Sequence, residues 1–212
     1  MKNSAAIIST PLIVFSALYM LVSVVVAFMQ RNTEFVFYIV VMGVLITSLV
    51  LVHKRVHFSN GILWGMSLWG FFHMAGGLVR VPEALTQDGS MPVLYSWWLI
   101  PGWLKYDQLV HAFGFGVTTW VCWQILRSNI EKQTGQTPAP TFGLCLLSAA
   151  GGMGFGALNE VVEFVATMTI PETNVGGYVN TGWDLVFNLL GCSVVALVIR
   201  QHHRISQARR MM

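Results

Sequence analysis

The chain has 212 residues, of which 10% are charged and 55% are hydrophobic, and its mean hydropathy is +0.63. A soluble domain carries about 25% charged residues, so this composition excludes a water-soluble globule and indicates an integral membrane protein. The net charge of +3 is too small for a nucleic-acid-binding protein. Three cysteines, all inside apolar runs, exclude a disulfide-stapled secreted fold.

Six apolar stretches are long enough to cross the hydrocarbon core of a bilayer, which takes about 18 residues or more. In chain order they run approximately over residues 7–29, 35–52, 61–79, 107–126, 142–168 and 183–199. Unbroken apolar runs are typical of helices, because the strands of a membrane barrel alternate in polarity. We therefore expect an all-α polytopic protein with six transmembrane helices, forming a single integral membrane domain over residues 1–212.

The basic residues are divided unequally between the two sides of the membrane. With six spans, one side holds both ends of the chain and the connections 2–3 and 4–5. That side has nine Lys and Arg residues, namely Lys2, Lys54, Arg55, Arg127, Lys132, Arg200, Arg204, Arg209 and Arg210. The other side has only Arg31, Arg80 and Lys105. Because cytoplasmic loops are enriched in Lys and Arg, we expect both termini in the cytoplasm and the protein in a bacterial inner membrane.

The connection between the third and fourth spans is long and aromatic. It runs from about Arg80 to Tyr106 and contains Trp97, Trp98 and Trp103, interrupted by prolines and a glycine. Tryptophan and tyrosine are enriched at the boundary between lipid and water. We therefore expect this Trp-rich segment to lie in the membrane interface, partly as a short helix, over the mouth of the bundle.

Ionisable and amide side chains occur inside the last four predicted spans. They are His73 in the third span, Asp107 and His111 in the fourth, Asn159, Glu160 and Glu163 in the fifth, and Asp184 and Asn188 in the sixth. Spacings of three or four residues place the members of each span on one helix face. With the predicted topology, all of them fall in the outer half of the membrane, whereas the inner half has only Gln124 and scattered hydroxyl groups.

These acids need compensation, because a carboxylate at the centre of a membrane helix costs about 2.5–3.5 kcal/mol on insertion scales. No Lys or Arg occurs between Lys132 and Arg200. The acids are therefore protonated, paired with a protonated histidine, or bound to a metal ion. Carboxylate and imidazole together suit Zn²⁺, Mn²⁺ or Fe²⁺. For a metal site we expect the ligands His73, Asp107, His111 and Asp184, the catalytic carboxylates Glu160 and Glu163, and supporting amides at Asn159 and Asn188.

Structural explanations compete with this metal site. Asp107 would be stabilised by the dipole at a helix start, and Asp184 with Asn188 would join the sixth span to the fifth by hydrogen bonds. The adjacent acids of the fifth span are harder to explain in this way, because two carboxylates repel unless one is neutral. The glycines of the same span, among them Gly152 and Gly156, form a helix-contact face for the fourth span, another span or another protomer.

The polar pattern resembles that of a known family. It comprises His73 with Gly76-Gly77, Tyr106-Asp107-x-x-x-His111-x-x-Gly114, Glu160-x-x-Glu163, and Trp183-Asp184-x-x-x-Asn188-x-x-Gly191. Over roughly residues 61–195 this resembles the YjdF-like bacterial inner-membrane proteins and, more loosely, VanZ-like proteins. The resemblance implies a polar site in the last four spans and assigns no reaction to it.

Three function classes remain open on the sequence. The first is a metal- or proton-binding site that acts on a lipid or lipid-linked envelope substrate; as an enzyme it would be a metal-dependent hydrolase. The second is a proton- or cation-coupled transporter that uses the paired glutamates as a relay. The third is a non-catalytic assembly or partner protein, in which the polar residues only hold the bundle together.

Overall fold

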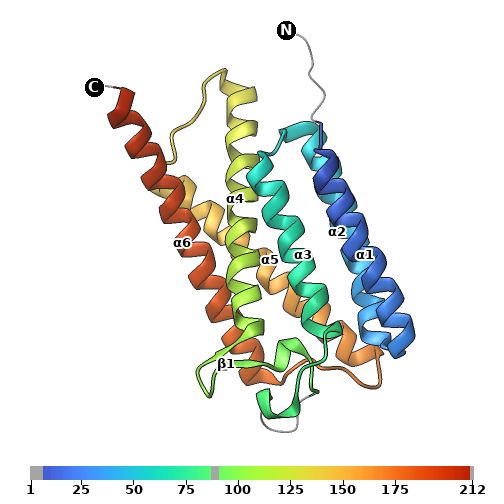
Figure 1. The fold of residues 1–212 in the computed structure, drawn as a ribbon. Coiled ribbons are helices and arrows are strands. Elements are labelled where there is room, and N and C mark those ends of the chain that lie inside the picture. Colours follow the sequence, from blue (N-terminus) through green and yellow to red (C-terminus); the bar gives the residue numbers. More distant parts are fainter. Residues whose placement is uncertain (1–6, 87–90, 211–212) are drawn as a thin grey trace.

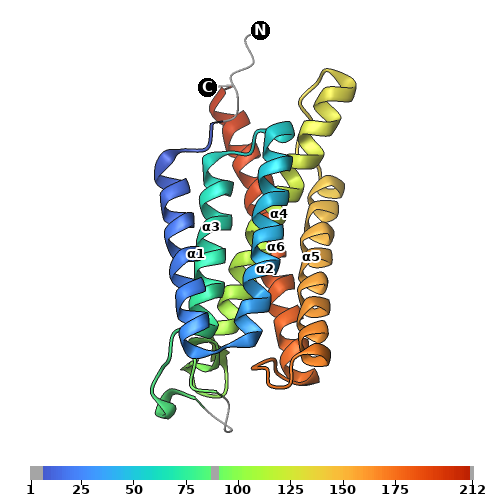
Figure 2. The ribbon, with the colours of Figure 1, turned by 90° about the vertical axis from the view of Figure 1, so that its right-hand side faces the viewer.

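A computed structural model describes residues 7–86 and 91–210, which form an elongated up-and-down helical bundle (Figure 1). Within these residues the α-helices are α1 (Thr10–Gln30), α2 (Thr33–Val56), α3 (Asn60–Leu78), α4 (Tyr106–Thr134), α5 (Phe142–Thr169) and α6 (Tyr178–Arg210). Helices that follow one another in the chain run in opposite directions, as both views show (Figures 1 and 2). The predicted all-α membrane architecture is confirmed.

Five of these helices are long and apolar enough to cross a membrane, and α3 is not among them. The sequence predicted six spans, the third of them over residues 61–79, and the helix that forms there has 19 residues. Its hydropathy is low because tryptophan, glycine, serine and His73 replace aliphatic residues. This composition fits its position, since α3 packs against α1 and α4 and so presents less of its surface to lipid.

Local sequence signals define where several helices begin and end. The side chains of Asn32, Ser59 and Thr141 accept hydrogen bonds from the first-turn backbone of α2, α3 and α5. At the other end of a helix, Gly135 adopts a φ of 70° and terminates α4. The helices α4 and α6 also run beyond the predicted spans. At 1.5 Å per residue α6 is about 50 Å long, more than the roughly 30 Å of a hydrocarbon core.

The helix α4 is the centre of the bundle and contacts α3, α5 and α6. Glycines permit this close packing. A Cβ atom at Gly191 in α6 would overlap the carbonyl oxygen of Ala112 in α4, and one at Gly152 in α5 would overlap the Thr119 hydroxyl of α4. The glycine face predicted for the fifth span therefore makes contacts within the chain. A Cβ atom at Gly154, in contrast, would meet no neighbouring side chain or helix within 4 Å.

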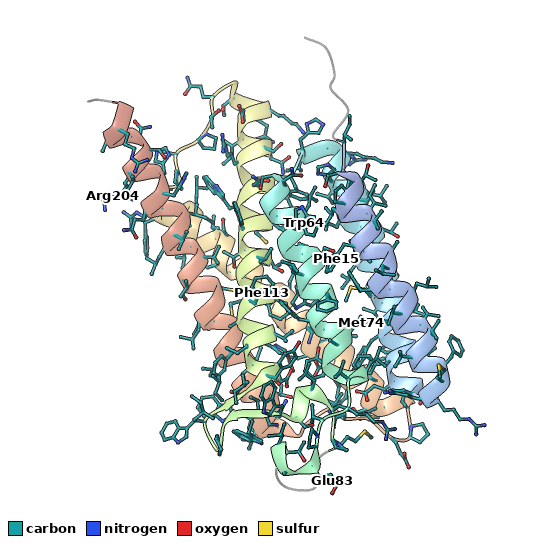
Figure 3. The ribbon with its side chains drawn as sticks, viewed as in Figure 1. Phe15, Trp64, Met74, Glu83, Phe113 and Arg204 are labelled. Atoms are coloured by element: carbon teal, nitrogen blue, oxygen red, sulfur yellow. The ribbon has the colours of Figure 1, made fainter. Side chains whose placement is uncertain are left out.

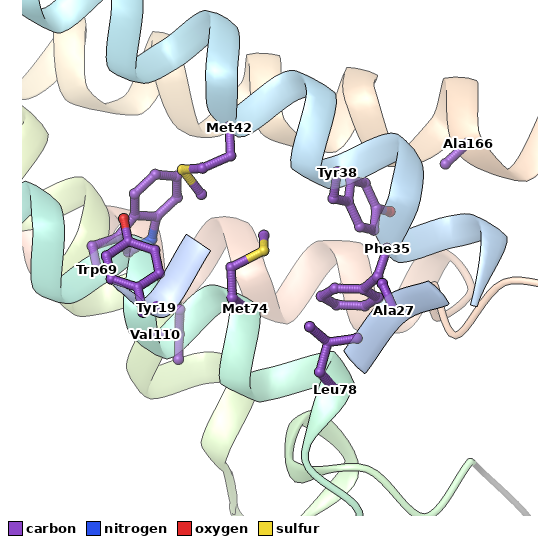
Figure 4. Close-up of a cluster of buried hydrophobic side chains, with 10 residues drawn as sticks. All are labelled: Tyr19, Ala27, Phe35, Tyr38, Met42, Trp69, Met74, Leu78, Val110 and Ala166. Carbon is purple, nitrogen blue, oxygen red and sulfur yellow. The ribbon is translucent and has the colours of Figure 1, made fainter. Parts of the chain in front are cut away.

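The largest apolar core lies between α1, α2 and α3 and extends to α4 and α5 (Figure 4). Its buried members are Tyr19, Ala27, Phe35, Tyr38, Met42, Trp69, Met74, Leu78, Val110 and Ala166. Phe35 packs so closely on α3 that a Cβ atom at Gly77 would overlap its ring. This core fixes the position of α2 and α3 beside the polar residues of α4 and α5.

The connection between α3 and α4 contains no α-helix in its described part. It forms the 3₁₀ turns η1 (Glu83–Leu85) and η2 (Leu94–Ser96) and a two-stranded antiparallel sheet of β1 (Trp98–Ile100) and β2 (Leu104–Lys105). The short helix expected here is replaced by these turns and strands, because Pro92 and Pro101 interrupt helical hydrogen bonding and Gly102 adopts a φ of 74°. Residues 87–90 of the connection lie outside the described residues.

The two ends of the bundle differ in what they hold. One end has the start of α1, the end of α6 and the connections α2–α3 and α4–α5 (Figure 1). The other end has the connections α1–α2, α3–α4 and α5–α6, and the α3–α4 connection lies across it. The first end therefore holds the described Lys and Arg residues in the last parts of α2, α4 and α6, and the second holds Arg31, Arg80 and Lys105. Which end faces the cytoplasm stays a prediction. Lys2, which was included in the charge count, lies outside the described residues.

Candidate functional site

His111 is the centre of a buried polar cluster near the end of the bundle that holds the α3–α4 connection. Its residue surface is 5% exposed. The Nε2 atom lies 3.6 Å from Asp107 Oδ1, one helical turn earlier. The Nδ1 atom lies 3.1 Å from Asn188 Oδ1 on α6 and 3.8 Å from Glu160 Oε1 on α5. One imidazole ring therefore contacts polar groups from three helices.

Helix packing brings these groups together. Asp107 and His111 are four residues apart and share one face of α4, and Asp184 and Asn188 do the same on α6. The second pair is almost completely buried, with 1% of Asp184 and none of Asn188 exposed. A Cβ atom at Gly156 would lie 2.6 Å from Asn188 Nδ2. Only glycine at this position of α5 leaves room for the amide beside His111.

Two groups of side chains in the described residues are close enough to hold a metal ion. Asp107, His111 and Asp184 form one group, and His111, Glu160 and Glu163 form the other. Within each group the potential ligand atoms all lie within 4.8 Å of one another. The structure therefore collects the carboxylates that the sequence singled out on the fourth, fifth and sixth spans around His111, which belongs to both groups.

The contact with Asn188 suits one tautomer of a neutral His111, in which Nδ1 carries the proton and donates to Asn188 Oδ1. Its Nε2 atom then holds a lone pair that faces the Asp107 carboxylate. Metal-binding histidines are commonly arranged in this way, with the second ring nitrogen donating to an oxygen that fixes the ring.

Several buried polar atoms of the cluster have no hydrogen-bond partner within the described residues. They are both carboxylate oxygens of Glu160, the Oδ1 atom of Asp184 and the Nδ2 atom of Asn188. In the same part of the chain, the only basic side chain within 4.0 Å of these carboxylates is His111. Because buried acceptors without a donor are costly, these oxygens require a bound proton or a cation. A divalent metal ion fits this donor set.

Polar residues that the sequence reasoning did not identify extend the cluster. Asn180 Nδ2 donates to Asp184 Oδ2 at 2.6 Å, and Lys105 Nζ donates to Asn180 Oδ1 at 3.2 Å. Asn180 precedes Asp184 by four residues, and this spacing was a usable signal in the sequence. Of the amides that were identified, Asn159 donates to Glu163 Oε1 at 2.8 Å.

His73 belongs to neither group of potential ligands. Its Nδ1 atom lies 2.5 Å from the hydroxyl oxygen of Tyr95, which comes from the α3–α4 connection. Burial raises the pKa of Tyr95 well above its usual value of about 10, so the phenol stays protonated and donates this hydrogen bond. The rings of Trp69 and Tyr38 also pack on His73. The assignment of His73 as a metal ligand stays a prediction.

A cavity of about 410 Å³ lies at the same end of the bundle. Two acids of the cluster, Asp107 and Glu163, form part of its wall together with His73 and Lys105. The rest of the lining comes from α2, the α3–α4 connection and residues 173–176, namely Glu34, Phe35, Tyr38, Met91, Tyr95, Ser96, Thr173, Asn174, Val175 and Gly176, with Asn180 from α6. This cavity gives a polar molecule of moderate size access to the acids.

Glu34 in the wall of this cavity was not identified from the sequence. It lies in the first turn of α2, and its Oε2 atom accepts a hydrogen bond of 2.9 Å from the backbone of Asn174. The Asn174 side chain donates in turn to Ser96 in the α3–α4 connection, at 3.5 Å. The sequence did contain a signal for Glu34, because an acidic residue stands at the start of an apolar span. Glu34 thus joins the segment between α5 and α6 to the rest of the cavity wall.

A family model described as "Predicted membrane protein (DUF2238)" matches residues 11–204. The match covers most of the chain and all of the cluster, so the protein belongs to this family. A protein of Thermotoga maritima described as "Uncharacterized protein" is 32% identical over 95 residues, which make up 44% of this chain. The chain spans about half the length of that relative, 47%. No solved structure matches the chain.

Proposed function

We propose that this member of the DUF2238 family binds one divalent transition-metal ion in the outer half of the membrane and uses it on a lipid or lipid-linked substrate. The observation that carries the proposal is the arrangement around His111. Nε2 of His111 faces the Asp107 carboxylate, and within the described residues Asp184 Oδ1 and both carboxylate oxygens of Glu160 have no hydrogen-bond partner. A cation held by Asp107, His111 and Asp184 would provide the partner that Asp184 Oδ1 lacks among the described residues, and Zn²⁺, Mn²⁺ and Fe²⁺ accept such mixed ligands.

The proposed membrane topology has six crossings, both termini in the cytoplasm, and an inner-membrane location. One feature supports a crossing by α3 despite its composition. The helix α2 ends at one end of the bundle and α4 begins at the other (Figure 1), so the chain covers the full length of the bundle between them. In this topology the Trp-rich segment of the α3–α4 connection lies in the outer interface. The proposal also includes the assignment of the chain to the YjdF-like proteins.

The roles of the side chains follow from their positions. Asp107, His111 and Asp184 would hold the ion, and Asn188 would fix the ring of His111. Glu163 forms part of both the second group and the cavity wall, which suits a general base facing the substrate. Bound to this site, a divalent ion supplies an activated water and a positive charge for a developing oxyanion. The proposed reaction is hydrolysis of an ester or phosphoester bond. Glu163 would accept the proton of the attacking water and return it to the oxygen of the leaving alcohol as the ester bond breaks.

A hydrolysis assay tests this function. Purified full-length protein is incubated in mixed micelles with a bacterial membrane lipid extract, with Zn²⁺, Mn²⁺ or Fe²⁺ added or with a chelator. We expect metal-dependent lipid products by mass spectrometry, and a loss of at least a hundredfold for Glu163→Gln, since general bases contribute about 10²–10⁴-fold. Glu172→Gln, outside the helices and the cavity lining, is the matched control. Product formation that is equal in Glu163→Gln and Glu172→Gln would contradict the proposal.

A proton- or cation-coupled transporter is the second candidate, and one observation favours it. Glu160 lies beside His111 and Glu163 lines the cavity, one turn apart on α5, which is a spacing suited to passing a proton. Against transport, contacts at Gly152 and Gly191 close the bundle on the inner side of the cluster. A flux assay in proteoliposomes distinguishes the two, because metal-dependent hydrolysis without flux excludes the transporter and flux abolished by Glu163→Gln favours it.

A further inference from the structure

A second and larger cavity lies between α4 and α6 and extends along most of their length, from Leu109 and Phe187 to Arg127 and Gln207. It is a groove of about 1230 Å³. Its walls are mainly apolar and include Phe113, Val117, Trp120, Val194 and Val198. None of the potential metal ligands lines it. The groove is therefore distinct from the candidate metal site and its polar cavity.

Helix geometry explains why the groove exists. The helices α4 and α6 touch at Gly116 and Gly191, where a Cβ atom at Gly116 would lie 3.2 Å from the carbonyl oxygen of Gly191. From this crossing they diverge toward the end of α6 (Figure 1). The α4–α5 connection contributes Pro138 and Pro140 to the lining but does not fill the space. A wedge-shaped opening remains between the helices.

The far end of the groove holds one permanent positive charge. It is carried by Arg127 on α4, and His202 and His203 on α6 are also among the lining residues. Within the described residues, no carboxylate lies within 4.0 Å of the Arg127 guanidinium. Glu131, one turn further along α4, accepts a hydrogen bond from the Thr137 hydroxyl instead. The positive charge at this end is thus available to an anion.

The part of the groove beyond the crossing matches one leaflet of a bilayer in length. The whole lining extends from Leu109 to Arg127 on α4 and from Phe187 to Gln207 on α6. From Gly116 to Arg127 and from Gly191 to His202, each wall rises about 16 Å at 1.5 Å per residue, and half of a hydrocarbon core is about 15 Å. This part is apolar near the crossing and reaches Arg127 at its other end, so its polarity suits an acyl chain with an anionic headgroup.

We infer that this groove binds one anionic glycerophospholipid of the leaflet at that end. An acyl chain lies between α4 and α6, and the phosphate group contacts Arg127, whose guanidinium suits phosphate oxygens. Charge complementarity and length together favour this occupant over a helix of another protein, which would not require a basic end. The inference concerns the opposite leaflet from the proposed metal site, so either one stands without the other.

Lipid binding by native mass spectrometry tests the inference. Detergent-purified full-length protein is titrated with dioleoyl phosphatidylglycerol, and in parallel with the zwitterionic dioleoyl phosphatidylcholine. We expect one retained phosphatidylglycerol. For Arg127→Gln we expect about fivefold weaker binding, because a basic residue near a membrane surface contributes about 1 kcal/mol. Arg204→Gln is the matched control, since Arg204 lies on the outer side of α6, away from α4 (Figure 3), and is not a lining residue.

A second pair of variants tests the apolar part of the groove. Val194→Trp fills the space between the helices and is expected to abolish lipid retention. Leu197→Trp, on the same helix but outside the lining, is expected to leave it unchanged. Both positions are exposed, at 57% and 65%, so both variants should fold. Equal retention of the two lipids, or equal binding by Arg127→Gln and Arg204→Gln, would overturn the inference. So would a dimer without bound lipid that Val194→Trp dissociates, because the groove would then be an interface between copies.

Discussion

Asn188 is the residue whose effect on the cluster is easiest to isolate, because it contacts the His111 ring and belongs to neither group of potential ligands. Without its amide oxygen, the proton on Nδ1 loses its acceptor and the lone pair on Nε2 is no longer fixed toward Asp107. Loss of such a supporting contact typically costs 10–100-fold in metal affinity. We expect Asn188→Ala to weaken Zn²⁺ or Mn²⁺ binding by about that factor in a competition assay with a chelating dye.

The control for this variant is Asn159→Ala, which removes the hydrogen bond to Glu163 but no contact with His111. Its effect on metal affinity should be clearly smaller. If both variants bind the metal as tightly as the wild-type protein, His111 is not the ligand that the geometry indicates. If Asn188→Ala unfolds, Asn188→Leu replaces it in the comparison, because leucine keeps the volume and removes the acceptor.

Tyr95 gives a prediction with a defined pH dependence. Tyr95→Phe removes the donor to His73, and a typical hydrogen bond contributes about 1 kcal/mol to stability. The pKa of Tyr95 is raised in the folded protein, so the unfolded state ionises first as the pH rises. The stabilisation should be fully present below about pH 10, the usual tyrosine pKa, and should decrease above it. Detergent-based unfolding of both proteins across this range measures it, and a difference that grows with pH would contradict the assignment.

At the scale of the elements, the close packing of α4, α5 and α6 depends on glycine. A Cβ atom at Gly191 would overlap the backbone of α4, and backbone cannot move aside as a flexible side chain can. We expect Gly191→Ala to cost about 1–3 kcal/mol, as overpacking typically does, and to weaken metal binding by separating Asp184 from His111. Gly154→Ala is the matched control, since that position is open and alanine favours a helix. In thermal unfolding, Gly191→Ala should therefore lower the melting temperature and Gly154→Ala should raise it slightly.

The elements also show how far the sequence alone determines the structure. Hydropathy predicted the helices, and the four-residue spacing placed Asp107 and His111 on one face of α4, where they lie 3.6 Å apart, because both signals are local. The contacts of Lys105, Glu34 and Asn174 were not predictable, since each joins segments far apart in the chain. The α3–α4 connection was expected to be partly helical, and its strands depend on pairing across Pro101 and Gly102.

At the scale of the whole molecule, the proposed orientation makes a direct prediction. A fluorescent protein fused after Met212 should fold and fluoresce in the cytoplasm. Alkaline phosphatase inserted in the α3–α4 connection should be active, because that enzyme needs an oxidising compartment for its disulfides. The basic residues at the end of the bundle that holds the end of α6 are the physical reason. An inactive phosphatase combined with a dark C-terminal fusion would reverse the orientation and move the candidate metal site to the cytoplasmic leaflet.

The central claim is that the cluster around His111 holds a metal ion, and metal content measures it most directly. Wild-type protein is purified in detergent without chelator after growth with Zn²⁺, Mn²⁺ and Fe²⁺, beside Asp107→Ala, Asp184→Asn and the control Glu131→Gln at the far end of α4. Inductively coupled plasma mass spectrometry should find about one metal ion per chain in wild type and control and much less in the two site variants. Folded wild-type protein without metal, or equal metal in all four proteins, would contradict the account.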